Sequence, residues 1–136
     1  MRFKNKTVFI TGAAGGIGRQ TGLSFAKEGA NVAVSDLDFD MASRVAKEIK
    51  SAGGKAEPFK LDVTNQNETI ENMKNAYEHF GSLDIAFCNA GIREIVSPLE
   101  LSIEEWRKVI DINVTGVFIT AQTFAKHCVE KKIKGN

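Results

Sequence analysis

The chain has 136 residues, 43% of them hydrophobic and 26% charged, which suffices for one domain with a packed core and leaves no room for a separate substrate domain. Its 18 basic and 17 acidic residues give a net charge of +1, so neither nucleic acid nor an anionic membrane is an expected partner. Without metal-ligand spacing, a signal peptide or an apolar run near the roughly 20 residues of a membrane span, we expect a cytoplasmic protein that contains no metal.

The first half of the chain alternates strand-like and helix-like segments. Residues 6–11 are a β-branched and aromatic run that predicts a buried strand, and residues 16–28 are expected to follow as a helix after a glycine-rich loop. Residues 31–35 predict a second strand. A second helix is expected to begin at Asp38 or Asp40, whose carboxylate can accept a free backbone N–H, and to end at residue 53.

The same alternation continues in the second half. Residues 55–61 predict a third strand, and Pro58 indicates an edge position because proline has no N–H to donate to a neighbouring strand. A helix is expected over residues 65–80 and a fourth strand over residues 83–88.

A long helix is expected after the fourth strand. Ser102 and Glu105 form a capping box at its start, and Gly135 marks its predicted end. Its apolar side comprises Trp106, Ile110, Val114, Val117, Phe118, Ala121 and Phe124. Four strands alternating with helices predict an α/β fold, a Rossmann-like doubly wound parallel sheet with the strand order 3-2-1-4. Such a sheet binds its ligand at the carboxyl ends of its strands, so the candidate site residues are those that follow the strands.

The loop after the first strand reads Thr-Gly-Ala-Ala-Gly-Gly-Ile-Gly over residues 11–18. Gly12 permits a tight turn, Gly16 lets the backbone approach a pyrophosphate, and Gly18 lets the helix pack against the strand. Gly15 and Ile17 complete the loop, and the backbone N–H groups at the start of the helix favour phosphate. A glycine-rich loop between a strand and a helix therefore predicts a dinucleotide-binding site.

Asp36 closes the second strand, where a carboxylate can accept two hydrogen bonds from the adenosine ribose. The same carboxylate repels a 2′-phosphate, and neither Gly15 nor Leu37 supplies a basic side chain to offset that repulsion. NAD is therefore the expected cofactor, and NADP is disfavoured. The alternative interpretation is a turn that Asp36 begins with Asp38.

Two further strand ends carry candidate ligand-binding residues. Asp62 can accept a hydrogen bond from the adenine amino group while Val63 covers a face of the ring, or Asp62 simply belongs to a turn at the strand end. Asn89, Ala90 and Gly91 close the fourth strand, where small residues admit a cofactor and the Asn89 amide can tie adjacent strands together.

A domain that binds S-adenosylmethionine, as in methyltransferases, is an alternative on these features. Such domains also combine a glycine loop with acids after the second and third strands. The glycine spacing and the Asn-Ala-Gly sequence at residues 89–91 favour a dinucleotide instead.

In order and spacing, these motifs closely resemble the short-chain dehydrogenase/reductase family over the whole chain. The matching segments are residues 11–18, Asp36, residues 62–63, residues 89–91 and Asn113 within Asp-Ile-Asn-Val-Thr-Gly. The resemblance implies an oxidoreductase that transfers a hydride between NAD and a small alcohol or carbonyl substrate, with residues 1–136 forming an incomplete NAD-binding Rossmann domain and no second domain. It also implies that Asn113 supports a water-linked proton relay to a catalytic lysine, and that the protein forms homo-oligomers through the long helix.

The family's remaining catalytic residues are a serine and a tyrosine that is followed four residues later by a lysine. Tyr77 is the only tyrosine of this chain and is followed at that spacing by Gly81, so the catalytic set is expected beyond Asn136. We therefore expect the isolated chain to be a truncated dehydrogenase without activity. The alternative is that the short chain is itself the working protein, a nucleotide-binding or interaction module without catalysis.

Overall fold

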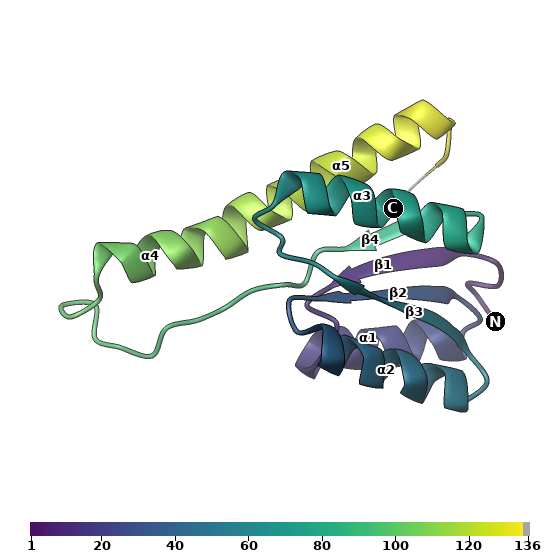
Figure 1. Ribbon diagram of the computed structural model, residues 1–136, viewed down its shortest axis with the longest axis horizontal. Coiled ribbons are helices and arrows are strands. Elements are labelled where there is room, and N and C mark those ends of the chain that lie inside the picture. The colour runs from purple at the N-terminus through teal and green to yellow at the C-terminus, as the bar shows by residue number, and fades with distance from the viewer. Residues whose placement is uncertain (135–136) are drawn as a thin grey trace.

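Residues 1–134 are described by the computed structural model, and their four strands form one parallel sheet in the order β3-β2-β1-β4 (Figure 1). The strands are β1 (Thr7–Thr11), β2 (Asn31–Asp36), β3 (Lys55–Lys60) and β4 (Ile85–Phe87). In the register of the sheet, Val8 of β1 lies between Val32 of β2 and Ile85 of β4. The predicted fold class and strand order are confirmed, as is the edge position of the strand that contains Pro58.

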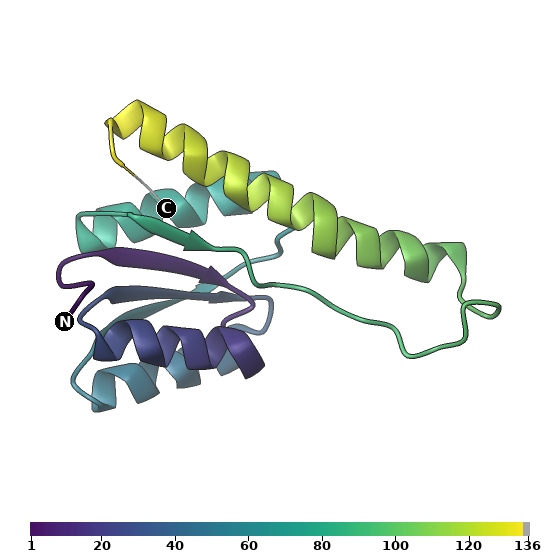
Figure 2. The same ribbon diagram turned by 180° about the vertical axis from the view of Figure 1, so that it is seen from behind.

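The helices cover both faces of this sheet. Helices α1 (Gly16–Lys27) and α2 (Phe39–Ser51) lie on one face, and α3 (Gln66–Phe80) and α5 (Gly116–Lys131) lie on the other (Figures 1 and 2). Because side chains alternate along a strand, Ile10 belongs to the core under α1 and α2, whereas Phe9 belongs to the core under α3 and α5. Both side chains are fully buried, so β1 is the centre of the two cores.

Three helices begin at side-chain caps, of which Asp38 and Ser102 are expected from the sequence and Asn65 is not. Asp38 accepts the Met41 N–H at the start of α2, and Asn65 accepts two backbone N–H groups at the start of α3. Ser102 and Glu105 form the expected reciprocal capping box of α4 (Ile103–Ile110). Each cap satisfies backbone donors that the first turn of a helix leaves without partners.

The expected long helix runs without a break from Ile103 to Lys131, but it differs from the expectation in two respects. Its middle is a π-helical segment η1 (Asp111–Thr115), which lies between α4 and α5. The helix also ends at Lys131, where Lys132 takes a left-handed conformation with φ of 55°. The predicted stop at Gly135 lies outside the described residues.

One other expectation needs correction. The fourth strand spans only Ile85–Phe87 rather than residues 83–88, although the Asp84 backbone N–H donates to the Thr7 carbonyl oxygen and its side chain accepts the Thr7 N–H. The apolar side of the long helix is largely uncovered: Trp106, Val114 and Phe118 are 52%, 56% and 60% exposed. Helix α4 and the loop before it project beyond the strands, so no sheet lies beneath this part (Figures 1 and 2).

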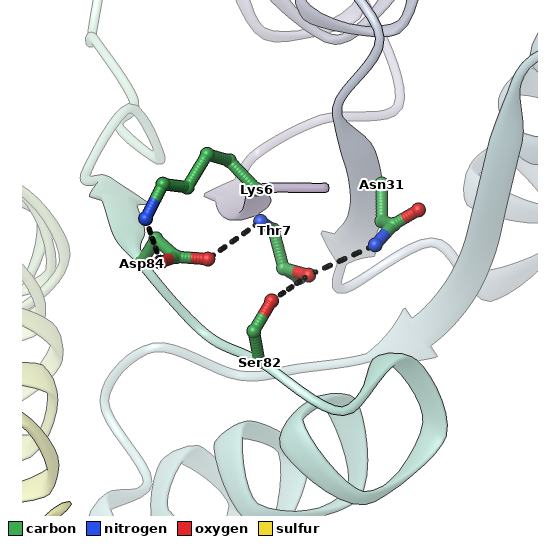
Figure 3. Close-up of polar contacts among 5 residues, drawn as sticks. All are labelled: Lys6, Thr7, Asn31, Ser82 and Asp84. Atoms are coloured by element: carbon green, nitrogen blue, oxygen red, sulfur yellow. Dashed lines mark hydrogen bonds and ion pairs between the residues drawn. The ribbon is translucent and has the colours of Figure 1, made fainter. Parts of the chain in front are cut away.

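At the amino ends of the strands, a polar network joins β1 to the start of β4 (Figure 3). Asp84 accepts hydrogen bonds from the Lys6 ammonium at 2.7 Å and from the Thr7 backbone N–H at 2.9 Å. The Thr7 hydroxyl lies 2.9 Å from the Ser82 hydroxyl and accepts a hydrogen bond from the Asn31 amide. The Asp84 side chain is only 9% exposed, so its charge depends on these partners.

The pKa of the Asp84 carboxyl is lowered below its ordinary value of 3.8. Burial by itself raises this pKa, but hydrogen bonds from Lys6, Thr7 and Ser82 outweigh burial because they favour the charged carboxylate. A folded-state pKa below the unfolded value means that the network contributes fully above a pH of about 3.9 and loses its contribution as the pH falls through the folded-state pKa.

We therefore predict that Asp84→Asn lowers the free energy of unfolding at neutral pH by about 2 kcal/mol, because the charged acceptor of Lys6 and Thr7 is lost. The difference between variant and wild type should shrink in acid, where the wild-type carboxylate becomes protonated. Urea denaturation at pH 7 and at about pH 3 measures both effects. Glu71→Gln, a change to an exposed acid on α3, is the control and should leave stability nearly unchanged. A deficit for Asp84→Asn that is the same at both pH values would contradict this account.

Candidate functional site

A cleft of about 880 Å³ lies where the carboxyl ends of the strands meet the loops that follow them. It brings together ten of the residues predicted from the sequence: Gly12, Gly15, Gly16, Ile17, Asp36, Asp62, Val63, Asn89, Ala90 and Gly91. Leu37, Leu61, Ile92, Arg93 and Ile112 complete the lining. Five separate segments of the chain thus meet in one cavity, and four of them follow strands, as the parallel topology requires.

The unpredicted lining residues differ in how they could have been found. Leu37 and Leu61 are sequence neighbours of Asp36 and Asp62, so their place at the strand ends follows from the same signal. Arg93 follows the Asn-Ala-Gly segment by two residues. Ile112 comes from η1, some twenty residues further along the chain, and although it directly precedes Asn113 in the Asp-Ile-Asn-Val-Thr-Gly motif, nothing in the sequence places it at the cleft.

The glycine-rich loop owes its course to close backbone contacts. Gly12 has φ of +62°, and a Cβ there would lie 2.8 Å from the Ala90 Cα. A Cβ on Gly18 would overlap the Gly12 carbonyl oxygen and lie 2.7 Å from the Asn89 side-chain nitrogen. Gly18 thus packs closely, but against Gly12 of the loop and the Asn89 side chain rather than against the strand, and it does not line the cleft.

Gly15 and Gly16 differ from these two glycines because their Cβ positions point into open space. Within the described chain no atom outside their immediate neighbours lies within 4 Å of either position. Gly16 also has φ of +49°, a conformation that side-chain-bearing residues rarely adopt. The loop therefore leaves room for a ligand at its backbone.

The start of α1 lacks the side-chain cap that α2, α3 and α4 have, and no residue of 1–134 caps it instead. Its N-cap is Gly15 in extended conformation, and its first turn contains no acidic residue. The free N–H groups and the positive end of the helix dipole are therefore directed at the cleft. This arrangement suits an anionic ligand group, and the open space at Gly15 and Gly16 lets such a group reach the backbone.

The Asp36 carboxylate is held by two backbone N–H groups. One oxygen accepts from Ala14 of the glycine loop at 2.9 Å, and the other accepts from Asp38 at 3.1 Å. The alternative turn that Asp36 begins with Asp38 is thus present. It coexists with a place in the cleft wall, where the carboxylate lies next to Leu37.

Asp62 forms a turn at the end of β3, which is the alternative to adenine binding that the sequence left open. One carboxylate oxygen accepts from both the backbone N–H and the hydroxyl of Thr64, at 2.9 and 2.7 Å. The Asp62 backbone N–H in turn donates to Glu68 at 3.0 Å. Asp62 nevertheless lines the cleft beside the buried Val63, so the turn fixes its position in the cleft wall.

Asn89 ties β4 to β1, as expected from its amide group. Its side-chain nitrogen donates to the Thr11 and Gly12 carbonyl oxygens at 3.1 and 3.0 Å. The Thr11 hydroxyl accepts the backbone N–H groups of both Asn89 and Ala90 at 3.0 Å. Thr11 is a positioning residue that the sequence reasoning missed, although it directly precedes the first glycine of the loop.

Asn113 does not line the cleft but holds one of its walls. Its side-chain oxygen accepts the Ile92 N–H and its side-chain nitrogen donates to the Ile92 carbonyl oxygen, both at 2.8 Å. The Asn113 side chain thus satisfies both backbone hydrogen-bonding groups of Ile92, as a neighbouring strand would do in a sheet. The π-helical segment that carries Asn113 is followed by Gly116, where a Cβ would lie 2.7 Å from a Val63 methyl carbon.

The rest of the described chain shows neither an activated thiol nor a metal cluster. Burial raises the pKa of the half-buried Cys88 thiol, which disfavours the nucleophilic thiolate. Within residues 1–134 no group of three or more His, Cys, Asp or Glu side chains could hold a metal ion. In the same span, every helix is too short or too polar to cross a membrane.

Comparison with known proteins places this geometry in a family. A family model described as short chain dehydrogenase matches residues 6–136. The chain is 44% identical over 118 residues to a cyclohexanol dehydrogenase of Acinetobacter sp. (strain SE19), covering 86% of this chain and 47% of that protein. It is 38% identical over 133 residues to glucose 1-dehydrogenase 2 of Bacillus subtilis (strain 168), covering 96% and 52%.

Solved structures agree with these relatives. The crystal structure of a short-chain type dehydrogenase/reductase from Mycobacterium marinum matches with a TM-score of 0.94 and 40% identity, over 98% of this chain and 54% of that one. A short chain dehydrogenase from Mycobacterium avium matches with a TM-score of 0.90 and 32% identity. The chain spans about half the length of the curated relatives it matches.

The contacts of the two kinds of glycine predict opposite results for Gly18→Ala and Gly15→Ala. Gly18→Ala should lower the free energy of unfolding by about 3 kcal/mol, because its methyl group overlaps backbone that cannot move without breaking the Asn89 tie. Gly15→Ala should cost about 1 kcal/mol or less, since its methyl group meets open space and only the helix-cap preference changes. Urea denaturation of both variants measures this, and equal losses would show that the close contact at Gly18 is not the constraint.

Proposed function

This chain belongs to the short-chain dehydrogenase family, and we propose that it forms the NAD-binding part of an oxidoreductase that transfers a hydride between NAD and a small alcohol or carbonyl substrate. Members of the family use NAD or NADP. The observation that carries the proposal is the cleft in which the uncapped start of α1, the Asp36 carboxylate and the Asn89–Gly91 backbone meet. When bound there, the nicotinamide ring supplies the hydride donor or acceptor.

The loop residues hold the phosphates of the cofactor in this proposal. Gly12, Gly15, Gly16 and Ile17 present backbone along the cleft, and Gly18 lets α1 start close beneath them. The free N–H groups of the first turn donate to the phosphate oxygens, and the helix dipole favours their negative charge. The open Cβ positions of Gly15 and Gly16 support this assignment because a side chain there would occupy the ligand's space.

The other strand ends hold the two nucleosides. Asp36 accepts hydrogen bonds from the adenosine ribose, while Asp62 and Val63 contact the adenine ring. Asn89, Ala90 and Gly91 lie beside the nicotinamide half, where their backbone is fixed by Thr11. The strand order supports this direction, because β3 and β2 carry the two acids on one side of β1 and β4 lies on the other.

NAD is the preferred cofactor because the Asp36 carboxylate would repel the 2′-phosphate of NADP at the same place. Basic residues near the loop do not offset that repulsion. The Arg19 guanidinium is paired with the Glu48 carboxylate, with an Nε–Oε2 distance of 2.9 Å. Leu37, the residue after Asp36, is apolar and 63% exposed.

We therefore predict that calorimetry of the chain detects NAD binding, and that the affinity for NADP is lower by roughly tenfold or more, because placing like charges side by side is unfavourable. Asp36→Asn should reduce this ratio towards one, since it removes the repelling charge while keeping an oxygen that can accept the Ala14 or Asp38 N–H. Asp40→Asn, on the exposed first turn of α2, is the control and should keep the wild-type ratio. Equal or tighter NADP binding by the wild type would refute the role of Asp36.

Asn113 supports, as a positioning residue, the proton relay that the family uses. Its side-chain groups are engaged with Ile92, so it acts on the relay by holding the helix and the loop after β4 in register. The tyrosine required as general acid or base has no counterpart at this cleft among residues 1–134. Tyr77 lines a groove between α3 and α5 instead, with its ring 5.0 Å from the His127 ring.

The 136-residue chain by itself is accordingly expected to show no alcohol-dependent reduction of NAD. Positioned proton transfer contributes about 10²–10⁴-fold to such reactions, and the described lining of the cleft contains no tyrosine, histidine or lysine to serve as the general acid or base. Absorbance at the NADH band, measured with homogeneous chain and a panel of alcohols, tests this. Substrate-dependent NADH formation would contradict the prediction that this chain binds the cofactor but does not catalyse the reaction. NAD binding without turnover is also what a non-catalytic nucleotide-binding module would show.

We also propose a cytoplasmic homo-oligomer, truncated here relative to the whole enzyme, with no nucleic-acid or membrane partner. The exposed apolar side chains Trp106, Val114 and Phe118 support self-association through the long helix, since such a surface is usually covered by another protein surface. The near-balanced charge of the chain supports the absence of polyanionic partners.

A further inference from the structure

The charges of the cleft follow the order of the strands. Asp62 comes after β3, Asp36 ends β2, the free start of α1 follows β1, and Arg93 follows β4. Asp36 and Asp62 are the only acids among the described lining residues, and Arg93 is the only lysine or arginine. One side of the cleft is therefore negative, whereas its centre and other side are positive.

Arg93 has no electrostatic partner of its own in the part of the chain that is described. Its guanidinium makes no hydrogen bond or ion pair with residues 1–134, unlike Arg19, which is paired with Glu48. Arg93 is exposed and lines the cleft with its five N–H donors unused. A planar guanidinium in this state is suited to bind a phosphate through two parallel hydrogen bonds.

The backbone next to Arg93 is fixed. Both polar backbone groups of Ile92 are bound by Asn113, at 2.8 Å each. Asn113 lies on η1, and Gly116, the first residue of α5 directly after η1, lies against Val63 of the cleft wall. The Arg93 side chain therefore starts from a defined position, so ordering it on a ligand costs less conformational entropy than ordering a residue of a free loop.

A dinucleotide that enters this cleft brings two negative charges close to Asp36. The positive end of a helix dipole corresponds to only about half an elementary charge, which does not balance a pyrophosphate. Among the described residues that line the cleft, Arg93 is the one side chain with a formal positive charge, and it follows β4, which pairs with β1.

We propose that Arg93 is a phosphate-binding residue of this cleft and that its guanidinium binds the pyrophosphate of the dinucleotide together with the backbone N–H groups at the start of α1. This inference rests on the proposed function, because it takes the dinucleotide as the ligand. It assigns to Arg93 a share of the cofactor affinity that depends on ionic strength.

The test is calorimetric titration of the chain with adenosine, ADP and NAD. In Arg93→Gln, the affinities for ADP and NAD should fall by roughly 10- to 100-fold, as expected for a lost charge-assisted hydrogen bond to phosphate. The affinity for adenosine should stay unchanged because adenosine carries no phosphate. Arg93→Lys should recover part of the loss, since it keeps the charge without the bidentate geometry. Raising the salt concentration should shrink the difference between wild type and Arg93→Gln.

Arg107→Gln is the matched control, because it removes the same charge from an exposed position on α4 outside the cleft. It should leave all three affinities at their wild-type values. If Arg93→Gln binds ADP and NAD like the wild type, the role of Arg93 is refuted while the proposed function stands. Equal losses for adenosine and ADP would also refute it, since phosphate would then not be what Arg93 binds. A wild-type chain that binds neither adenosine nor NAD would overturn the proposed function and this inference together.

Discussion

The tie between the carboxyl ends of β1 and β4 is the constraint on which the site depends. The Asn89 side chain donates to the Thr11 and Gly12 carbonyl oxygens, and the Thr11 hydroxyl accepts two backbone N–H groups in return. Backbone can approach this closely only because Gly12 and Gly18 have no side chains. The tie sets where α1 begins, and the start of α1 with its free N–H groups then defines the centre of the cleft.

The short length of β4 explains why it is tied at both ends. A strand of three residues forms few ladder hydrogen bonds with β1. At the amino end, Asp84 binds Lys6 and the Thr7 N–H, and at the carboxyl end Asn89 binds the glycine loop. Hydrogen bonds from polar side chains thus supplement the few backbone hydrogen bonds between β4 and β1, and they keep β4 and the residues after it at a fixed place beside β1.

The long helix contributes to the site through its irregularity. The π-helical segment η1 directs Asn113 to Ile92, and Gly116 then brings α5 against Val63. One wall of the cleft is therefore held by a helix that lies far away in the sequence. The same helix leaves Trp106 of α4, Val114 of η1 and Phe118 of α5 exposed, so the surface proposed for self-association lies on the helix that holds this wall.

The sequence by itself determined the fold class, the strand order and ten of the cleft-lining residues, because strand periodicity, caps and glycine spacing are local patterns that parallel topology brings to one edge. It did not reveal η1, the clamp of Asn113 on Ile92 or the lining role of Ile112, since these depend on contacts between segments some twenty residues apart. Whether Asp62 formed a turn or lined a cleft was also undecided from sequence. Only the tertiary structure decided that it does both, because the hydrogen bonds of its carboxylate to Thr64 fix it in the cleft wall.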